Sequence, residues 1–167
     1  MIEIDLLGPG PSASLDLAER LRGRRVGVVG NAFELAPWAE FLAASDVQWW
    51  DKHPAAMAFC GARYAPHRKA GLQQLPGART NWNSGVLGLA VAVSLGATLV
   101  RLHGFDLRGS HFFGPYTNGL RNTAPARREI HQQQFAQWAR QNPHVRVVNC
   151  TPGSALRCFE FDEQIAA

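Results

Sequence analysis

The first residues of this chain that could carry chemistry form a glycine-rich turn. They are Gly8, Gly10, Pro11 and Ser12 of the segment Gly-Pro-Gly-Pro-Ser, between an apolar run and an amphipathic segment. Glycines let a backbone approach a ligand closely, and the start of a helix offers free N–H groups to an anion. The segment is neither G-x-G-x-x-G nor a P-loop, which ends in GK[ST]. It therefore predicts either a phosphate-binding turn or a plain tight turn.

Polar residues also occur at two other places where elements are expected to begin or end. Asn31 follows the apolar run 26–30, and its amide can both donate to and accept from a base, a ribose or a sugar. The alternative is an Asx-turn or a helix cap. Ser84 and Gly85 follow Asn83 at the start of an apolar helix. The start of this second helix would suit a phosphate or a carboxylate. The alternative is that these residues only cap the helix.

Asp106 and His111 are the candidates for acid–base work and hydroxyl binding. Asp106 ends the segment Gly-Phe-Asp, where a carboxylate could hold a ribose hydroxyl, a metal or a turn. His111 lies in the polar loop 108–124 and is the preferred general base, or else a structural residue packed in that loop. His53 is a second candidate, whereas His103 is expected to be structural. No metal-binding motif such as HExxH occurs, so no metal site is predicted.

The elements that would position these residues alternate between strands and helices. Strands are predicted at 2–7, 26–30, 46–51, 62–64, 98–103 and 145–149, and helices at 14–23, 37–44, 83–95 and 125–141. This order is typical of an α/β fold. We expect a single Rossmann-like domain over residues 1–167, with a mainly parallel sheet of about five or six strands flanked by helices. In such sheets ligands bind beyond the carboxyl ends of the strands, where the loop 108–124 would be mobile and cover the cleft.

Composition excludes several other classes of protein. The chain has 167 residues, of which 46% are hydrophobic and 18% charged, which suits one compact domain. No apolar run is long enough for a membrane span, and no signal peptide is expected at the N-terminus. Three cysteines without CxxC spacing argue against a disulfide framework and favour a reducing cytoplasm. The net charge of +4 favours an anionic partner, either a phosphate ligand or a nucleic acid.

Several motifs occur together in one order between residues 4 and 158. They are Gly8–Ser12, Val29–Asn31, Asn83–Val86, Gly104–Asp106 and Asn149–Ser154. This order resembles the bacterial CMP-sialic-acid-dependent sialyltransferases, the phage proteins related to them, and the wider 6-hydroxymethylpterin pyrophosphokinase-like group. The resemblance implies a cytidine nucleotide held at the strand ends by the glycine-rich turn and Asn31, with Ser84 and Gly85 at the donor site.

The resulting prediction is a nucleotide-sugar-dependent, sialyltransferase-like glycosyltransferase that is cytoplasmic and encoded by a phage or prophage. The sequence leaves open both a monomer and a homo-oligomer. The stretch 122–128 matches the position of the family's lid histidine but has none. An accessory protein that binds a nucleotide without catalysis is therefore an alternative. A pyrophosphokinase-like transferase would need Mg²⁺ on Asp106 or Asp51. A nucleic-acid-associated protein would use the arginines with Trp49, Trp50 and Trp82.

Overall fold

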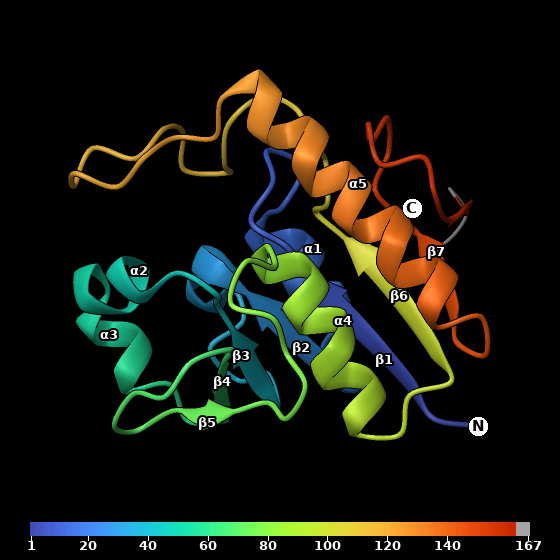
Figure 1. The fold of residues 1–167 in the computed structure, drawn as a ribbon, viewed down its shortest axis with the longest axis horizontal. Coiled ribbons are helices and arrows are strands. Elements are labelled where there is room, and N and C mark those ends of the chain that lie inside the picture. The colour runs from blue at the N-terminus through green and yellow to red at the C-terminus, as the bar shows by residue number, and fades with distance from the viewer. Residues whose placement is uncertain (163–167) are drawn as a thin grey trace.

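A computed structural model describes residues 1–162 and contains one parallel sheet of eight strands (Figure 1). The strand order is β5-β4-β3-β2-β1-β6-β7-β8. The strands are β1 (Glu3–Leu7), β2 (Val26–Val29), β3 (Phe41–Ala43), β4 (Ala62–Ala65), β5 (Gln73–Gln74), β6 (Leu99–His103), β7 (Arg146–Asn149) and β8 (Glu160–Phe161). The helices are α1 (Leu15–Arg20), α2 (Val47–Lys52), α3 (Pro54–Met57), α4 (Ser84–Ser94) and α5 (Pro125–Gln141), with a 3-10 turn at Gly30–Glu34. The predicted α/β fold with a parallel sheet is confirmed.

Helices cover both faces of the sheet. In Figure 1, α4 and α5 lie in front of the sheet and α1 lies behind it. Ile4 and Leu6 of β1 belong to the hydrophobic cluster that includes α4 and α5, whereas Leu7 belongs to the cluster that includes α1. Successive side chains of a strand point to opposite faces, so both faces of β1 are buried.

The buried helix α4 is positioned by its cap and by a glycine. The Asn83 side-chain oxygen accepts a hydrogen bond of 3.1 Å from the Val86 N–H and so caps the helix. A Cβ atom on Gly88 would lie 2.8 Å from a Val29 methyl carbon and 3.0 Å from a Leu6 methyl carbon. The absence of a side chain at Gly88 therefore lets α4 pack closely on β1 and β2.

The chain changes direction across the sheet at β1. β1 pairs in parallel with both β2 and β6, so the strands β2–β5 lie on one side of it and β6–β8 on the other. After β1 the chain therefore continues to one side of the sheet, and after β6 it continues to the other. This topological switch point is where open α/β sheets bind their ligands.

A polar network that includes two buried side chains joins β1 and β6 below this edge. His103 is 1% exposed, and its Nε2 lies 2.8 Å from Asp5 Oδ1. Arg24 Nε lies 3.2 Å from the other Asp5 oxygen. His103 thus has the structural position that the sequence predicted for it.

Two predicted elements near the third strand are wrong. The segment 46–51, predicted as a strand, is helix α2, because Asp46 caps it and Trp50 Nε1 donates back to Ala44 O at 3.0 Å. The segment 37–44, predicted as a helix, contains β3 instead. β3 is buried on both faces between β2 and β4, and a short apolar run of this kind has no periodicity that separates strand from helix.

The sheet also has more strands than predicted. β5 and β8 are two residues long each and carry no hydrophobic pattern. In contrast, β4 matches the predicted strand 62–64, and α5 has the predicted bounds. No helix within the described residues combines the length and the apolar character that a membrane crossing needs.

Candidate functional site

A pocket of about 510 Å³ lies at the switch point, between the loops that follow β1, β6 and β7. Its lining residues are Pro11, Ser12, Asp106, Arg108, Gly109 and Pro152. Three of these, Pro11, Ser12 and Asp106, were predicted from the sequence. The pocket therefore combines a hydroxyl, a carboxylate and a guanidinium group in the position where this class of fold binds ligands.

Asp106 is the most constrained polar residue of the pocket. It is 4% exposed, and its Oδ2 accepts hydrogen bonds from the Ser12 N–H at 3.2 Å and the Ser12 hydroxyl at 2.8 Å. Its Oδ1 has no hydrogen-bond partner within residues 1–162. Ser12 thus fixes the carboxylate, and one oxygen remains able to accept a hydrogen bond from a ligand hydroxyl.

The glycine-rich turn uses its backbone N–H groups within the fold. The Gly8 N–H donates to His103 O at 2.7 Å, and the Gly10 N–H donates to Gly104 O at 2.9 Å. The Ala13 N–H donates to Gly10 O. Pro9 and Pro11, on either side of Gly10, have no backbone N–H. The helix that follows, α1, has only six residues and is capped by its own serine, Ser14. Phosphate binding at this turn stays a prediction. It requires the backbone N–H groups to leave their carbonyl partners and donate to the phosphate instead.

Close packing explains both glycines of the turn. A Cβ atom on Gly8 would lie 2.9 Å from Gly104 O. A Cβ atom on Gly10 would lie 2.1 Å from Asp106 Oδ2 and 2.5 Å from Gly104 O. These glycines let the loop after β1 lie against the loop after β6, and that contact forms the wall of the pocket.

Asn31 lies outside the pocket lining, at the centre of a second polar cluster. Its Oδ1 accepts from Trp49 Nε1 at 2.8 Å and from the Tyr116 hydroxyl at 3.0 Å. Its Nδ2 donates to Glu34 Oε1 at 2.7 Å and to His53 Nε2 at 3.1 Å. An amide side chain has two donors and two acceptor lone pairs, so Asn31 is fully satisfied by the protein.

His53, the second acid–base candidate, is engaged in the same cluster. Its Nδ1 lies 2.8 Å from the Trp49 carbonyl oxygen, which can only accept. Nδ1 therefore carries the proton, and Nε2 accepts from Asn31. Both ring nitrogens have protein partners, and the ring stacks on Trp49 with 4.4 Å between centroids.

We predict that Asn31→Ala lowers the free energy of unfolding by about 3 kcal/mol, because each buried polar partner left unpaired costs about 1–3 kcal/mol. Denaturant unfolding measures this loss. The exposed Asn81, whose side chain makes no hydrogen bond with the described residues, provides the matched control, Asn81→Ala. Unchanged stability in Asn31→Ala, together with weaker nucleotide binding, would instead show that Asn31 contacts the ligand directly.

The loop 108–124 crosses the carboxyl edge of the sheet and reaches the Asn31 cluster. Figure 1 shows it running from the end of β6 toward α2 before it returns to α5. The Phe112 N–H donates to Pro9 O at 3.0 Å, and the Tyr116 hydroxyl donates to Asn31. Burial raises the pKa of Tyr116 to about 12, so its hydroxyl stays protonated at neutral pH. The loop therefore contacts both the glycine-rich turn and the cluster; its mobility stays a prediction.

His111 lies in this loop beside the Phe112 contact. Its ring stacks on Phe113 with 4.8 Å between centroids and packs against Tyr116 at 4.5 Å. Its Nδ1 lies 3.3 Å from Gly114 O, so Nδ1 carries the proton, and Nε2 has no hydrogen-bond partner in the described structure. Burial lowers the pKa of His111 below its usual value. The ring is therefore neutral at pH 7, as a general base must be.

Ser84 and Gly85 are not among the residues that line the pocket, and Ser84 lies near the end of β3. The Ser84 hydroxyl accepts from the Ser45 N–H at 2.9 Å. A Cβ atom on Gly85 would lie 2.5 Å from the Phe135 ring and 2.9 Å from the Phe105 ring. Gly85 thus has a packing role, and a contact of Ser84 with a donor stays a prediction.

Sequence reasoning missed Arg108, Gly109 and Pro152 as lining residues. The available signal was the position of Arg108, two residues after Asp106 in the same loop. The suggestion that Trp49 and Trp50 could stack on nucleic acid is wrong, because these side chains are 5% and 1% exposed.

Comparison with known proteins links the chain to one class of fold. No protein-family model and no curated protein matches its sequence. Among solved structures, it is similar to the MAf glycosyltransferase from Magnetospirillum magneticum AMB-1, with a TM-score of 0.68 and 12% sequence identity. The match covers 99% of this chain and 34% of that chain, so this chain spans about a third of the length of that glycosyltransferase. The similarity shows a shared fold, whereas the sialyltransferase-like family and the phage origin remain predictions.

Proposed function

We propose that this protein is a glycosyltransferase whose donor is a nucleotide-activated sugar, and that this donor is a CMP-linked sugar. The observation that carries the proposal is the pocket at the switch point, where Asp106 presents a free carboxylate oxygen beside Arg108. The structural similarity to a glycosyltransferase supports the class of reaction. The order of motifs in the sequence supports the cytidine nucleotide.

Asp106 and Arg108 fit the two chemical features of a nucleotide. Asp106 Oδ1 would accept a hydrogen bond from a ribose hydroxyl, while Ser12 holds the other carboxylate oxygen in place. Arg108 is exposed and has no ion pair among the described residues, so its guanidinium is available to a phosphate. The two side chains come from one loop, which places a hydroxyl site next to an anion site.

In the proposed reaction, an acceptor hydroxyl attacks the anomeric carbon of the donor sugar. The new C–O bond forms as the bond from this carbon to the nucleotide phosphate oxygen breaks. His111 Nε2 takes the proton of the acceptor hydroxyl, and Arg108 stabilises the charge that develops on the leaving phosphate. Free nucleotide and the glycosylated acceptor are the products.

A thermal-shift screen over nucleotides and nucleotide-sugars tests this proposal. A ligand at 100 times its Kd is expected to stabilise the fold by about 2.7 kcal/mol. CMP-linked sugars should give the largest shift, and release of free CMP from them should follow. A folded protein that none of these compounds stabilises would contradict the proposal.

The alternative of nucleotide binding without catalysis is favoured by one observation. His111 is held in a stack with Phe113 and Tyr116, which would give it a purely structural role. Stabilisation by CMP-linked sugars without any release of CMP would support this alternative.

The pH dependence of turnover follows from the environment of His111. Burial lowers the pKa of His111 below its usual value of 6.5. The imidazole is therefore mostly neutral at any pH above 6.5. We therefore predict a rate that rises through a midpoint below pH 6.5 and then levels off as the pH increases toward 8. Measurement of initial rates between pH 4.5 and 8, at saturating donor, checks this, and a midpoint above pH 7 would exclude His111 as the base.

A further inference from the structure

Some of the arginines have a carboxylate partner among the described residues, and others do not. At the amino edge of the sheet, Arg25 pairs with Glu40 at 2.8 Å and Arg146 with Glu160 at 2.6 Å. At the carboxyl edge, Arg68 has no ion pair or hydrogen bond among the described residues. Arg68 is therefore available to an external anion on the same edge as the candidate site.

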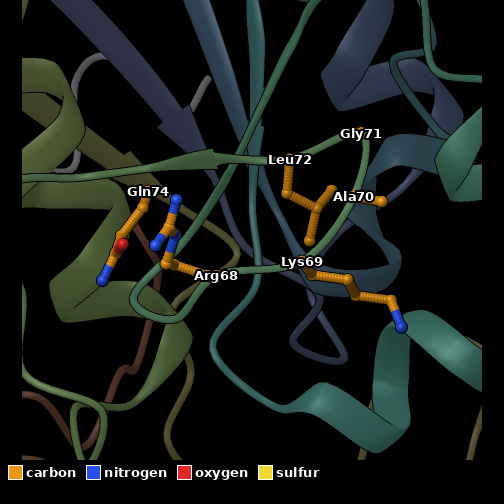
Figure 2. A pocket seen from close by; sticks show the side chains of 6 residues that line it. All are labelled: Arg68, Lys69, Ala70, Gly71, Leu72 and Gln74. Atoms are coloured by element: carbon orange, nitrogen blue, oxygen red, sulfur yellow. The ribbon is translucent and has the colours of Figure 1, made fainter.

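Arg68 lines a second cavity, of about 570 Å³, in the loop that follows β4 (Figure 2). The lining residues are Arg68, Lys69, Ala70, Gly71, Leu72 and Gln74. Figure 2 shows the side chains of Arg68 and Gln74 lying near each other on one side of the loop, with Lys69 extending to the other side. Lys69 forms an ion pair of 2.6 Å with Asp51 of α2, so that carboxylate is already engaged.

The chemistry of these side chains selects a particular group. The guanidinium of Arg68 can bind a carboxylate or a phosphate through two parallel hydrogen bonds. The Gln74 amide donates to Pro66 O at 3.3 Å, which leaves its carbonyl oxygen able to accept from a hydroxyl. The cavity therefore fits an acidic group that carries a neighbouring hydroxyl.

Its place on the sheet relates this cavity to the donor pocket. β4 is three strands from β1 in the sheet order, and strands lie about 4.8 Å apart, so about 14 Å separates these two strands. The donor pocket lies on the same carboxyl edge, on the side of β1 that faces β6 and β7. We propose that the cavity after β4 binds the carboxylate or phosphate of an acidic acceptor sugar. The anion site stands on its own residues, and only its assignment to the acceptor depends on the proposed glycosyltransferase function.

A titration followed by backbone amide chemical shifts tests this proposal on the whole chain. The probes are galacturonate, neutral galactose of the same shape, and inorganic phosphate. We expect galacturonate or phosphate to give saturable shifts at residues 68–74, and galactose to give none. A response to galacturonate alone identifies a carboxylate, and an equal response to phosphate identifies a general anion site.

Arg68→Ala should weaken this binding about tenfold or more, which corresponds to about 1.4 kcal/mol. Arg140→Ala should not weaken it, because Arg140 of α5 is exposed and has no ion pair or hydrogen bond among the described residues. Absence of saturable shifts at residues 68–74, or equal affinity in Arg68→Ala, would overturn the inference. Titration of CMP in the same sample reports the donor pocket separately. Failure of CMP to shift residues 12, 108 and 109 would count against the proposed function and leave the anion site in place.

Discussion

Replacement of His111 by glutamine is expected to lower turnover by about 10²–10⁴-fold while donor affinity changes little. Glutamine retains a hydrogen-bonding amide but cannot take the proton of an acceptor hydroxyl. His111 is suited to this step because its Nδ1 faces Gly114 O and its Nε2 has no partner among the described residues. Steady-state kinetics with a CMP-linked sugar, together with the Kd for the donor, measures both quantities.

Two other histidines provide the controls for this result. His53→Gln tests the second candidate, whose ring nitrogens both have protein partners. His144→Gln alters an exposed histidine that has no hydrogen bond, ion pair or ring contact among the described residues. If His111→Gln lowers stability, donor affinity and turnover together, the ring only packs against Phe113 and Tyr116, and the assignment of the base is wrong.

The Gly10→Ala variant is expected to lower the free energy of unfolding by about 3 kcal/mol, near the upper end of the usual cost of overpacking. The added Cβ atom would lie 2.1 Å from Asp106 Oδ2 and would separate this carboxylate from Ser12. Denaturant unfolding measures the loss. Binding of CMP should weaken as well, because Asp106 would no longer be fixed in the pocket.

Gly23→Ala is the matched control for this variant. Gly23 has a φ of +88° and no atom within 4 Å of the added Cβ position. Gly23→Ala therefore introduces backbone strain but no steric clash. Strain of this kind costs about 1–2 kcal/mol. A loss of stability in Gly10→Ala no larger than that in Gly23→Ala would show that the contact between the two loops is not tight.

The sequence predicted those elements whose patterns are local. Helix α5 has the predicted bounds, and β6 and β7 lie within the predicted strands 98–103 and 145–149. β3 and α2 were interchanged because Phe41–Ala43 is a short, fully buried run without periodicity. Tryptophan favours strands, yet the segment with Trp49 and Trp50 is helical, because Asp46 caps it.

The candidate site was only partly predictable for a similar reason. The strand ends located Ser12 and Asp106 separately, but their hydrogen bond joins residues 94 positions apart. The bond between Asn31 and Tyr116 spans 85 positions and depends on how the loop 108–124 folds back over the sheet. Such long-range pairs follow from the packing of loops, which no local sequence pattern specifies.

Calorimetric titration of CMP into the wild-type protein and Arg108→Ala tests the central claim most directly. Arg108 is exposed and unpaired among the described residues, so its removal should leave the fold intact. The account predicts saturable binding at one site in the wild type, about tenfold weaker or more in Arg108→Ala and unchanged in Arg140→Ala. Absence of binding to the folded wild type, or equal affinity in Arg108→Ala, would contradict a nucleotide site in the pocket between the loops after β1 and β6.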